Sequence, residues 1–305
     1  MLSFGRVFLA RTWYAMNPIP YVGPRDLADM QIRGDVDHKG HSGGRVLVIG
    51  GGGPYAGPPA LSALAAYRAG ADLVYVAAPR RIADIISSFS PDLIVWPMSQ
   101  RDTFVEDDIE LLKPLIEYVR VVVIGMGIEI TPHTAALIKA ITPLCERIVM
   151  DAGALMPEYP LKGILTPHHN EFRRISGKGT TWDPEANAAL AKTFAAERGV
   201  VTVIKGPVDV IADSGRIAFN RTGNPGMTVT GTGDVMAGVI GSLYCKNPAF
   251  EAACCGTFLA GAAGNLAFEE AGFGMTASDV VDMIPYVLKA HHPAYAKQLQ
   301  NNSRF

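Results

Sequence analysis

Residues 45–50 read RVLVIG and residues 120–125 read RVVVIG, and both apolar runs end in a glycine. A third run, VVTVIK, occupies residues 200–205. None of them has the strict apolar–polar alternation of a strand with one face in water. Continuous apolar strands are typical of a parallel sheet that helices cover on both faces. The three runs therefore predict an α/β fold with a mostly parallel central sheet.

The segments around these runs predict alternating strands and helices. Further strands are expected at residues 72–77, 92–96, 147–150 and 163–166, with a hairpin of residues 208–212 and 216–219. Helices are expected at residues 59–69, 107–118, 131–141, 183–198, 233–245, 250–271 and 277–289. Strands that alternate with helices form layers in which the helices enclose the sheet. We expect one three-layer α/β/α domain over residues 38–305.

The composition excludes several classes of protein. Of the 305 residues, 49% are hydrophobic and 18% are charged, so extended disorder is not expected. The formal net charge of -2 favours neither nucleic acid nor an anionic membrane as a partner. No apolar stretch reaches the ~20 residues of a membrane span. The 4 cysteines form no CxxC pair, which argues against disulfides and zinc and predicts reduced thiols in the cytoplasm.

Residues 1–37 are expected to be an N-terminal extension of this domain. Residues 1–25 contain arginines but no acidic residue, a composition similar to that of a transit peptide. Two other interpretations stay open. The start is over-long and true initiation is at Met16, or residues 1–15 form a helix that packs on the domain.

Ligands of such a sheet bind beyond the carboxyl ends of the strands. The loop of residues 224–234, NPGMTVTGTGD, leads into a helix of small residues. Gly231 and Gly233 let the backbone approach a ligand, and free N–H groups at the helix start form an anion site. A carboxylate at Asp234 is suited to accept a proton from a hydroxyl that attacks phosphorus. The alternative is an aspartate that only stabilises the helix N-terminus.

Two other strand ends carry candidate groups. Lys205 ends a buried strand and precedes Gly206, which suits contact with a phosphate, although a surface lysine at a strand end would look the same. His168 follows Pro167 after a strand, at the edge where ligands bind, and a solvated loop histidine is the alternative there.

Five segments together resemble one known family. Residues 223–243, GNPGMTVTGTGDVMAGVIGSL, closely resemble the ADP- or ATP-dependent NAD(P)H-hydrate dehydratases of the ribokinase-like superfamily. The other four are HKG at residues 38–40, YAGPPAL at 55–61, LTPHHNEF at 165–172 and FLAGAAGN at 258–265. The resemblance extends from about residue 38 to residue 285 and implies a ribokinase-like three-layer fold.

The resemblance implies a repair reaction on damaged cofactors. In this family, ATP or ADP phosphorylates the 6-hydroxyl of hydrated NADH or NADPH, and phosphate then leaves to restore NAD(P)H. Asp234 would be the catalytic base, Mg²⁺ the cofactor and Glu171 a candidate metal ligand. The implied substrate-binding residues are Pro58, Gly127, His168, Asn224 and Asp234. The implied nucleotide-binding residues are Lys205, Gly206, Pro207, Val208, Asp209 and Gly233.

The sequence departs from the family pattern at four places. Pro58 replaces the alanine of a GAP motif, and GMGIE at residues 125–129 replaces GPGLG. DAGAL at residues 151–155 has one carboxylate fewer than DADAL. In the nucleotide loop, Pro207 removes one N–H and Asp209 places an acid near phosphates. These differences leave the choice between ADP and ATP open.

Two other functions stay open. A small-molecule kinase for a sugar or a hydroxymethyl heterocycle would share the fold, Asp234 and the anion site, whereas a nucleotide sensor would keep only the pocket. GNPGM before GTGD, together with TPHHNE, favours the dehydratase, and an intact Asp234 argues against a sensor. The 37 residues before His38 are too few for the epimerase domain often fused to this family, so a separate epimerase is expected. The resemblance also implies a homotetramer.

Overall fold

The computed structural model describes residues 19–33 and 44–295. Within them, one sheet has the strand order β3-β2-β1-β4-β5-β6-β7-β8-β9. The strands from β3 to β7 run parallel, and β8 and β9 form an antiparallel hairpin at one edge. The strands are β1 (Arg45–Ile49), β2 (Leu73–Ala78), β3 (Ile94–Pro97), β4 (Val121–Ile124), β5 (Ile148–Met150), β6 (Ile164–Leu165), β7 (Val201–Ile204), β8 (Asp209–Ala212) and β9 (Ile217–Asn220).

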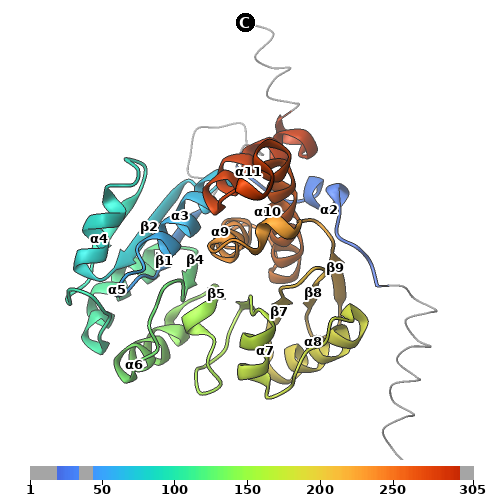
Figure 1. Ribbon diagram of the computed structural model, residues 1–305. Coiled ribbons are helices and arrows are strands. Elements are labelled where there is room, and N and C mark those ends of the chain that lie inside the picture. The colour runs from blue at the N-terminus through green and yellow to red at the C-terminus, as the bar shows by residue number, and fades with distance from the viewer. Residues whose placement is uncertain (1–18, 34–43, 296–305) are drawn as a thin grey trace, which may run out of the picture.

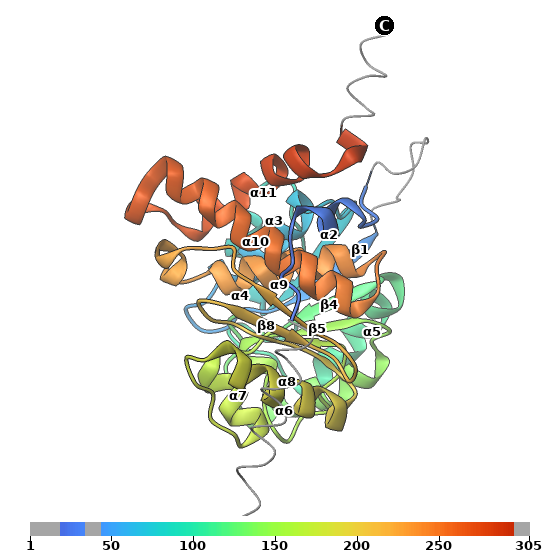
Figure 2. The same cartoon turned by 90° about the vertical axis from the view of Figure 1, so that its right-hand side faces the viewer.

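Helices cover both faces of this sheet, as Figures 1 and 2 show. The helices that pack on one face are α5 (Ile109–Tyr118), α6 (Pro132–Ile141), α7 (His169–Ser176) and α8 (Pro184–Arg198). Those on the other face are α2 (Pro24–Ala28), α3 (Gly57–Arg68), α4 (Arg80–Ser87), α9 (Thr232–Tyr244), α10 (Ala249–Ala271) and α11 (Ala277–His291). The expected three-layer α/β/α fold with a mostly parallel sheet is therefore confirmed.

The central strands are apolar throughout because each of their faces is buried. In β1, Val46 and Val48 join the core under α3 and α9, whereas Leu47 and Ile49 join the core under α5 and α6. Successive side chains of a strand point to opposite faces, so a strand covered on both sides buries nearly every side chain. Removal of apolar surface from water on both faces is the main favourable contribution to folding.

The predicted helices and strands match the structure with shifts of one or two residues at most ends. The helix expected at residues 183–198 is α8, where Asp183 Oδ1 accepts the Glu185 N–H at 3.0 Å. Gly199 ends α8 with a φ of 65°, a left-handed conformation that favours glycine. Three helices were not expected, α2, α4 and α7. Helix α2 has 5 residues and the other two have 8 each, which is too short for a clear helical repeat of apolar positions.

Residues before the first strand also pack on the domain. The Val22 N–H donates to Phe219 O at 2.8 Å, and Leu27 and Ile32 are buried in the core under α10 and α11. The expected helix of residues 1–15, the alternative start at Met16 and the HKG segment lie outside the described residues. The boundary at residue 38 stays a prediction. None of the helices within residues 19–33 and 44–295 is long and apolar enough to cross a membrane.

Candidate active site

Three neighbouring strands bring charged side chains to one edge of the sheet. Asp151 directly follows β5, Glu171 lies in the first turn of α7 after β6, and Lys205 directly follows β7. Because β5, β6 and β7 are adjacent and parallel, their carboxyl ends meet at the same edge. Helix α9 also begins here, with Asp234 in its first turn. The groups therefore converge from four different elements.

Lys205 is the centre of this cluster. Its Nζ lies 2.8 Å from Asp151 Oδ1 and 4.0 Å from Glu171 Oε2, and its side chain is only 18% exposed. A methyl group built on Gly233 would lie 3.3 Å from the same Nζ. Burial lowers the pKa of Lys205, but Asp151, Glu171 and Asp234 outweigh this effect and raise the pKa overall. The ammonium is therefore a stable positive charge beside the start of α9.

Asp234 faces this charge from the helix. Burial, together with the carboxylates of Asp151 and Glu171, raises the pKa of its carboxyl group to about 7 against the opposing effect of Lys205. Among the residues that the structure describes, no hydrogen bond contributes to the pKa of this carboxyl group. A base works best when its pKa is near the working pH, because it is then both available and strong enough to take the proton. The surroundings of Asp234 suit proton transfer at neutral pH.

The loop before α9 is held in place by packing and by hydrogen bonds. Gly231 has a φ of 104°, and a methyl group there would lie 2.7 Å from Leu61 Cδ1 and 2.8 Å from Ala277 Cβ. Asn224 Oδ1 accepts the Gly226 N–H at 2.9 Å, while Asn224 Nδ2 donates to Gly264 O at 3.0 Å. Gly231 thus allows close packing against α3 and α11, and Asn224 connects the loop to α10.

His168 begins α7 as its N-cap. Its Nδ1 accepts the N–H groups of Asn170 at 3.1 Å and Glu171 at 3.3 Å, and its own N–H donates to Glu171 Oε2 at 2.8 Å. These reciprocal bonds satisfy backbone groups that a helix start leaves unpaired. The Glu171 carboxylate, predicted as a metal ligand, is thus engaged as a cap and also lies near Lys205. The His168 side chain remains 52% exposed toward solvent.

The loop of residues 205–209 connects β7 to β8. Gly206 and Pro207 are exposed, whereas the Asp209 side chain is buried and accepts the Gly206 N–H and Asn220 Nδ2–H, both at 2.9 Å. Burial raises the pKa of Asp209 to about 6, although hydrogen bonds from Asn220 and Gly206 and the charge of Lys205 lower it in part. The Asp209 carboxylate therefore points into the protein, where its hydrogen bond with the Gly206 N–H fixes the backbone of this loop.

Pro58 and Gly127 lie at the ends of neighbouring strands. Pro58 is in the first turn of α3 after the β1 loop, and Gly127 is in the loop after β4. Gly127 has a φ of 70°, and a methyl group there would lie 2.9 Å from Tyr55 Cβ. The two residues border the same sheet edge as the charged cluster, on the side of β1 and β4. Their contact with a substrate stays a prediction.

Asp151 is the charged residue of the cluster that was not selected from the sequence. It is 2% exposed and makes the shortest contact to Lys205 in the cluster. In the sequence, the DAGAL segment of residues 151–155 is notable for the carboxylate that it lacks and not for the aspartate that it keeps. A carboxylate directly after a buried parallel strand was the available signal.

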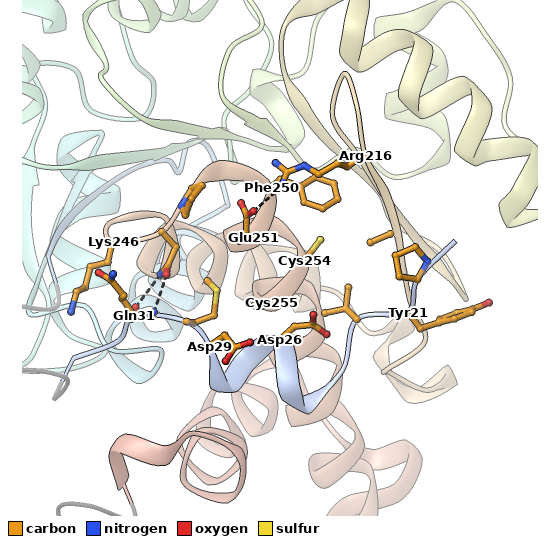
Figure 3. A pocket seen from close by; sticks show the side chains of 16 residues that line it. Tyr21, Asp26, Asp29, Gln31, Arg216, Lys246, Phe250, Glu251, Cys254 and Cys255 are labelled. Atoms are coloured by element: carbon orange, nitrogen blue, oxygen red, sulfur yellow. Dashed lines mark hydrogen bonds and ion pairs between the residues drawn. The ribbon is translucent and has the colours of Figure 1, made fainter. Parts of the chain in front are cut away.

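A separate pocket of about 460 Å³ lies away from this cluster, and Figure 3 shows its lining. Tyr21, Asp26 and Arg216 line it, together with Cys254 and Cys255. It also includes residues 246–248, just beyond the C-terminal end of α9, whereas Asp234 is at the N-terminal end. At 1.5 Å per residue the two ends are roughly 18 Å apart. The pocket is therefore distinct from the candidate active site.

The fold and the site together define a ribokinase-like α/β protein. The structure is similar to that of a ribokinase-like superfamily protein from Enterococcus faecalis, with a TM-score of 0.77 and 23% identity. That similarity covers 90% of this chain and 96% of the other. Residues 46–286 match the model of the NAD(P)H-hydrate dehydratase family. The chain belongs to this family.

Individual relatives agree with this assignment. The bifunctional NAD(P)H-hydrate repair enzyme of Archaeoglobus fulgidus is 41% identical over 265 residues, which are 86% of this chain and 54% of the relative. The chain thus spans about half the length of such bifunctional relatives. The ADP-dependent (S)-NAD(P)H-hydrate dehydratase of Cenarchaeum symbiosum is 36% identical over 83% of this chain and 91% of its own length.

A solved structure of a dehydratase is also similar. The ADP/ATP-dependent NAD(P)H-hydrate dehydratase of Bacillus subtilis, co-crystallised with ATP and Mg²⁺, is 25% identical, with a TM-score of 0.77. The similarity covers 90% of this chain and 100% of that chain. The family resemblance found in the sequence motifs is confirmed by these comparisons.

Proposed function

We propose that this protein removes water from hydrated NADH or NADPH and uses ADP or ATP to do so. The observation that carries the proposal is the carboxylate of Asp234, with a pKa of about 7, beside the Lys205 ammonium at the start of α9. Family membership and similarity to dehydratases support it. The reaction would be a phosphorylation followed by an elimination.

In the first step, Asp234 accepts the proton of the substrate 6-hydroxyl. The hydroxyl oxygen attacks the terminal phosphorus of the nucleotide, a new P–O bond forms, and the shortened nucleotide leaves. Lys205 and the N–H groups at the start of α9 offset the negative charge on the phosphoryl oxygens. In the second step, the C6–O bond breaks and phosphate departs with its electrons. The ring nitrogen lone pair supports the departure, and loss of a C5 proton restores the double bond.

The other proposed nucleotide-binding and substrate-binding residues lie around the same edge of the sheet. Gly206, Pro207, Val208 and Asp209 would hold the nucleotide with Lys205 and Gly233, through an exposed backbone that the inward-facing Asp209 shapes. Pro58, Gly127, His168 and Asn224 would border the nicotinamide substrate. These roles rest on position at the strand ends and on the family motifs.

Mg²⁺ suits this site as a companion of the nucleotide. A nucleotide-bound Mg²⁺ needs only one or two protein carboxylates beside the phosphates. No group of three or more His, Cys, Asp or Glu side chains that could hold a metal ion occurs in the described parts of the chain. Since Glu171 is engaged by His168, it would serve at most as one ligand among phosphates and waters. The ion would neutralise charge on the transferred phosphoryl group.

We further propose a cytoplasmic homotetramer that works with a separate NAD(P)H-hydrate epimerase. The free, buried state of all 4 cysteines supports a reducing compartment. The bifunctional character of the Archaeoglobus relative supports a link between dehydratase and epimerase activities.

The test is to incubate the protein with hydrated NADH, Mg²⁺ and either ADP or ATP, and to follow the absorbance band of the reduced nicotinamide. The proposal expects one nucleotide consumed for each NADH restored, with no phosphorylated organic product at the end. Stoichiometric phosphorylation of a sugar or pyrimidine alcohol without recovery of NADH would instead identify a small-molecule kinase.

A further inference from the structure

Trp182 presents its indole ring to solvent next to the loop assigned to the nucleotide. The residue is 83% exposed, the largest exposed fraction among the described large hydrophobic residues. Its ring packs against that of His169, with 5.4 Å between the ring centroids and an interplanar angle of 55°. An aromatic ring with most of its surface in water offers a free face on which the base of a nucleotide can stack.

The backbone that carries this indole is held on both sides. On one side, the buried Asn187 side chain accepts the Thr181 N–H at 2.9 Å and donates to Thr181 O at 2.8 Å. On the other side, Asp183 caps α8 through the Glu185 N–H. The exposed ring therefore stands on an ordered support, which reduces the entropy lost when a ligand stacks on it.

His169 links the indole to the nucleotide loop. Its Nδ1 lies 2.5 Å from Thr180 Oγ1, whereas its Nε2 is buried and has no hydrogen-bond partner among the residues that the structure describes. A methyl group built on Gly206 would lie 3.2 Å from this Nε2. An unsatisfied nitrogen therefore faces the first residue after Lys205.

We propose that Trp182 stacks on the base of the nucleoside di- or triphosphate held by residues 205–209. The proposal rests on the nucleotide site of the proposed function. Stacking on a π-face tolerates any base, so Trp182 contributes affinity and position for the nucleotide, whereas the phosphates are held by Lys205 and Gly233. Trp182 is a positioning residue in this scheme.

The experiment compares Trp182→Ala and Trp182→Phe with the wild type by calorimetry. The ligands are ADP, and inorganic pyrophosphate as a probe without a base. Loss of base stacking is expected to weaken ADP binding by about 5- to 100-fold in Trp182→Ala, with most affinity retained in Trp182→Phe. Pyrophosphate binding should not change. Trp96→Ala is the matched control, because Trp96 is also exposed but lies on β3 at the opposite edge of the sheet.

Tryptophan emission gives an independent measurement. ADP is expected to quench the tryptophan emission of the wild type and of Trp96→Phe to the same extent. Most of this quenching should be lost in Trp182→Phe. Unchanged ADP affinity in Trp182→Ala, or equal weakening for ADP and pyrophosphate, would overturn the proposal. A changed oligomeric state of Trp182→Ala in light scattering would overturn it as well, since the ring would then be an interface residue.

A further variant separates this inference from the proposed function. Gly233→Val adds bulk next to Lys205 Nζ and does not touch Trp182. If Gly233→Val weakens ADP binding and Trp182→Ala does not, the nucleotide site stands and only the stacking is wrong. If Gly233→Val leaves ADP binding unchanged, the nucleotide lies elsewhere and the proposed site fails together with the stacking.

Discussion

Replacement of Asp234 by Asn tests whether this residue is a catalytic base or only stabilises the start of α9. Asp234→Asn keeps the size and shape of the side chain but cannot accept the hydroxyl proton. General-base catalysis is typically worth about 10²- to 10⁴-fold in rate, so turnover should fall by that factor. Nucleotide affinity should hold or improve, because a negative charge beside the phosphates is removed.

The same substitution has a pH-dependent effect on stability. The pKa of Asp234 is raised from 3.8 to about 7 in the folded protein, so the fold prefers the protonated form. From about pH 4 to pH 7 the folded state holds more protons than the unfolded state, and the free energy of unfolding therefore falls as the pH rises. Above pH 7, the ionised carboxylate costs roughly 2–4 kcal/mol after allowance for solvent screening.

Asp234→Asn removes this cost. The variant should be more stable than the wild type at pH 8 and should match it near pH 4, as measured by urea unfolding at both pH values. Turnover is measured on the same preparation. An aspartate that only stabilises the start of α9 predicts the opposite, a less stable variant with near-normal turnover. Retention of more than about a tenth of wild-type turnover would refute the catalytic role.

Other parts of the site give further predictions. In Gly233→Val, the added side chain crowds Lys205 Nζ, so calorimetry should show at least about 10-fold weaker ADP binding with a circular dichroism spectrum like that of the wild type. Asp209→Ala removes the acceptor shared by the Gly206 N–H and the buried Asn220 Nδ2–H, which should lower the free energy of unfolding by about 1–3 kcal/mol and weaken ADP binding. A variant as stable as the wild type contradicts the role of Asp209 in the loop. For the wild type, log kcat/KM should rise with a slope near one below about pH 7 and level off above it, because the base form of Asp234 is required. A plateau that already begins near pH 5 would show that the essential base has an ordinary carboxylate pKa.

The layers of the fold could be predicted because each follows from a local pattern. The apolar runs in β1 and β4 predicted a sheet buried on both faces, and the alternation of Val46 and Leu47 between two cores explains why these runs have no polar position. The short helices α4 and α7 could not be predicted in this way. The start of α7 depends on a histidine side chain that accepts backbone N–H groups, a role that the residue type alone does not indicate.

The charged residues of the site were predicted in part. Asp234 and Lys205 were selected from their positions beside glycines at strand and helix ends. The contact of Lys205 with Asp151 joins residues 54 positions apart, and it depends on β5 and β7 lying on either side of β6. Strand order of this kind is a property of the whole chain. The inward orientation of Asp209 likewise depends on strand pairing, because its partner Asn220 lies opposite it on β9.

The central claim is that Asp234 and Lys205 serve a nucleotide-driven dehydration, and its most direct test is the stoichiometry of the complete reaction. Purified protein, hydrated NADH, Mg²⁺ and a limiting amount of ADP or ATP are mixed, and the restored NADH, the released phosphate and the remaining nucleotide are quantified together. The account predicts equal amounts of NADH restored, phosphate released and nucleotide consumed, with no turnover in the absence of nucleotide. Recovery of NADH without nucleotide consumption, or nucleotide consumption that yields a stable phosphorylated product, would contradict it.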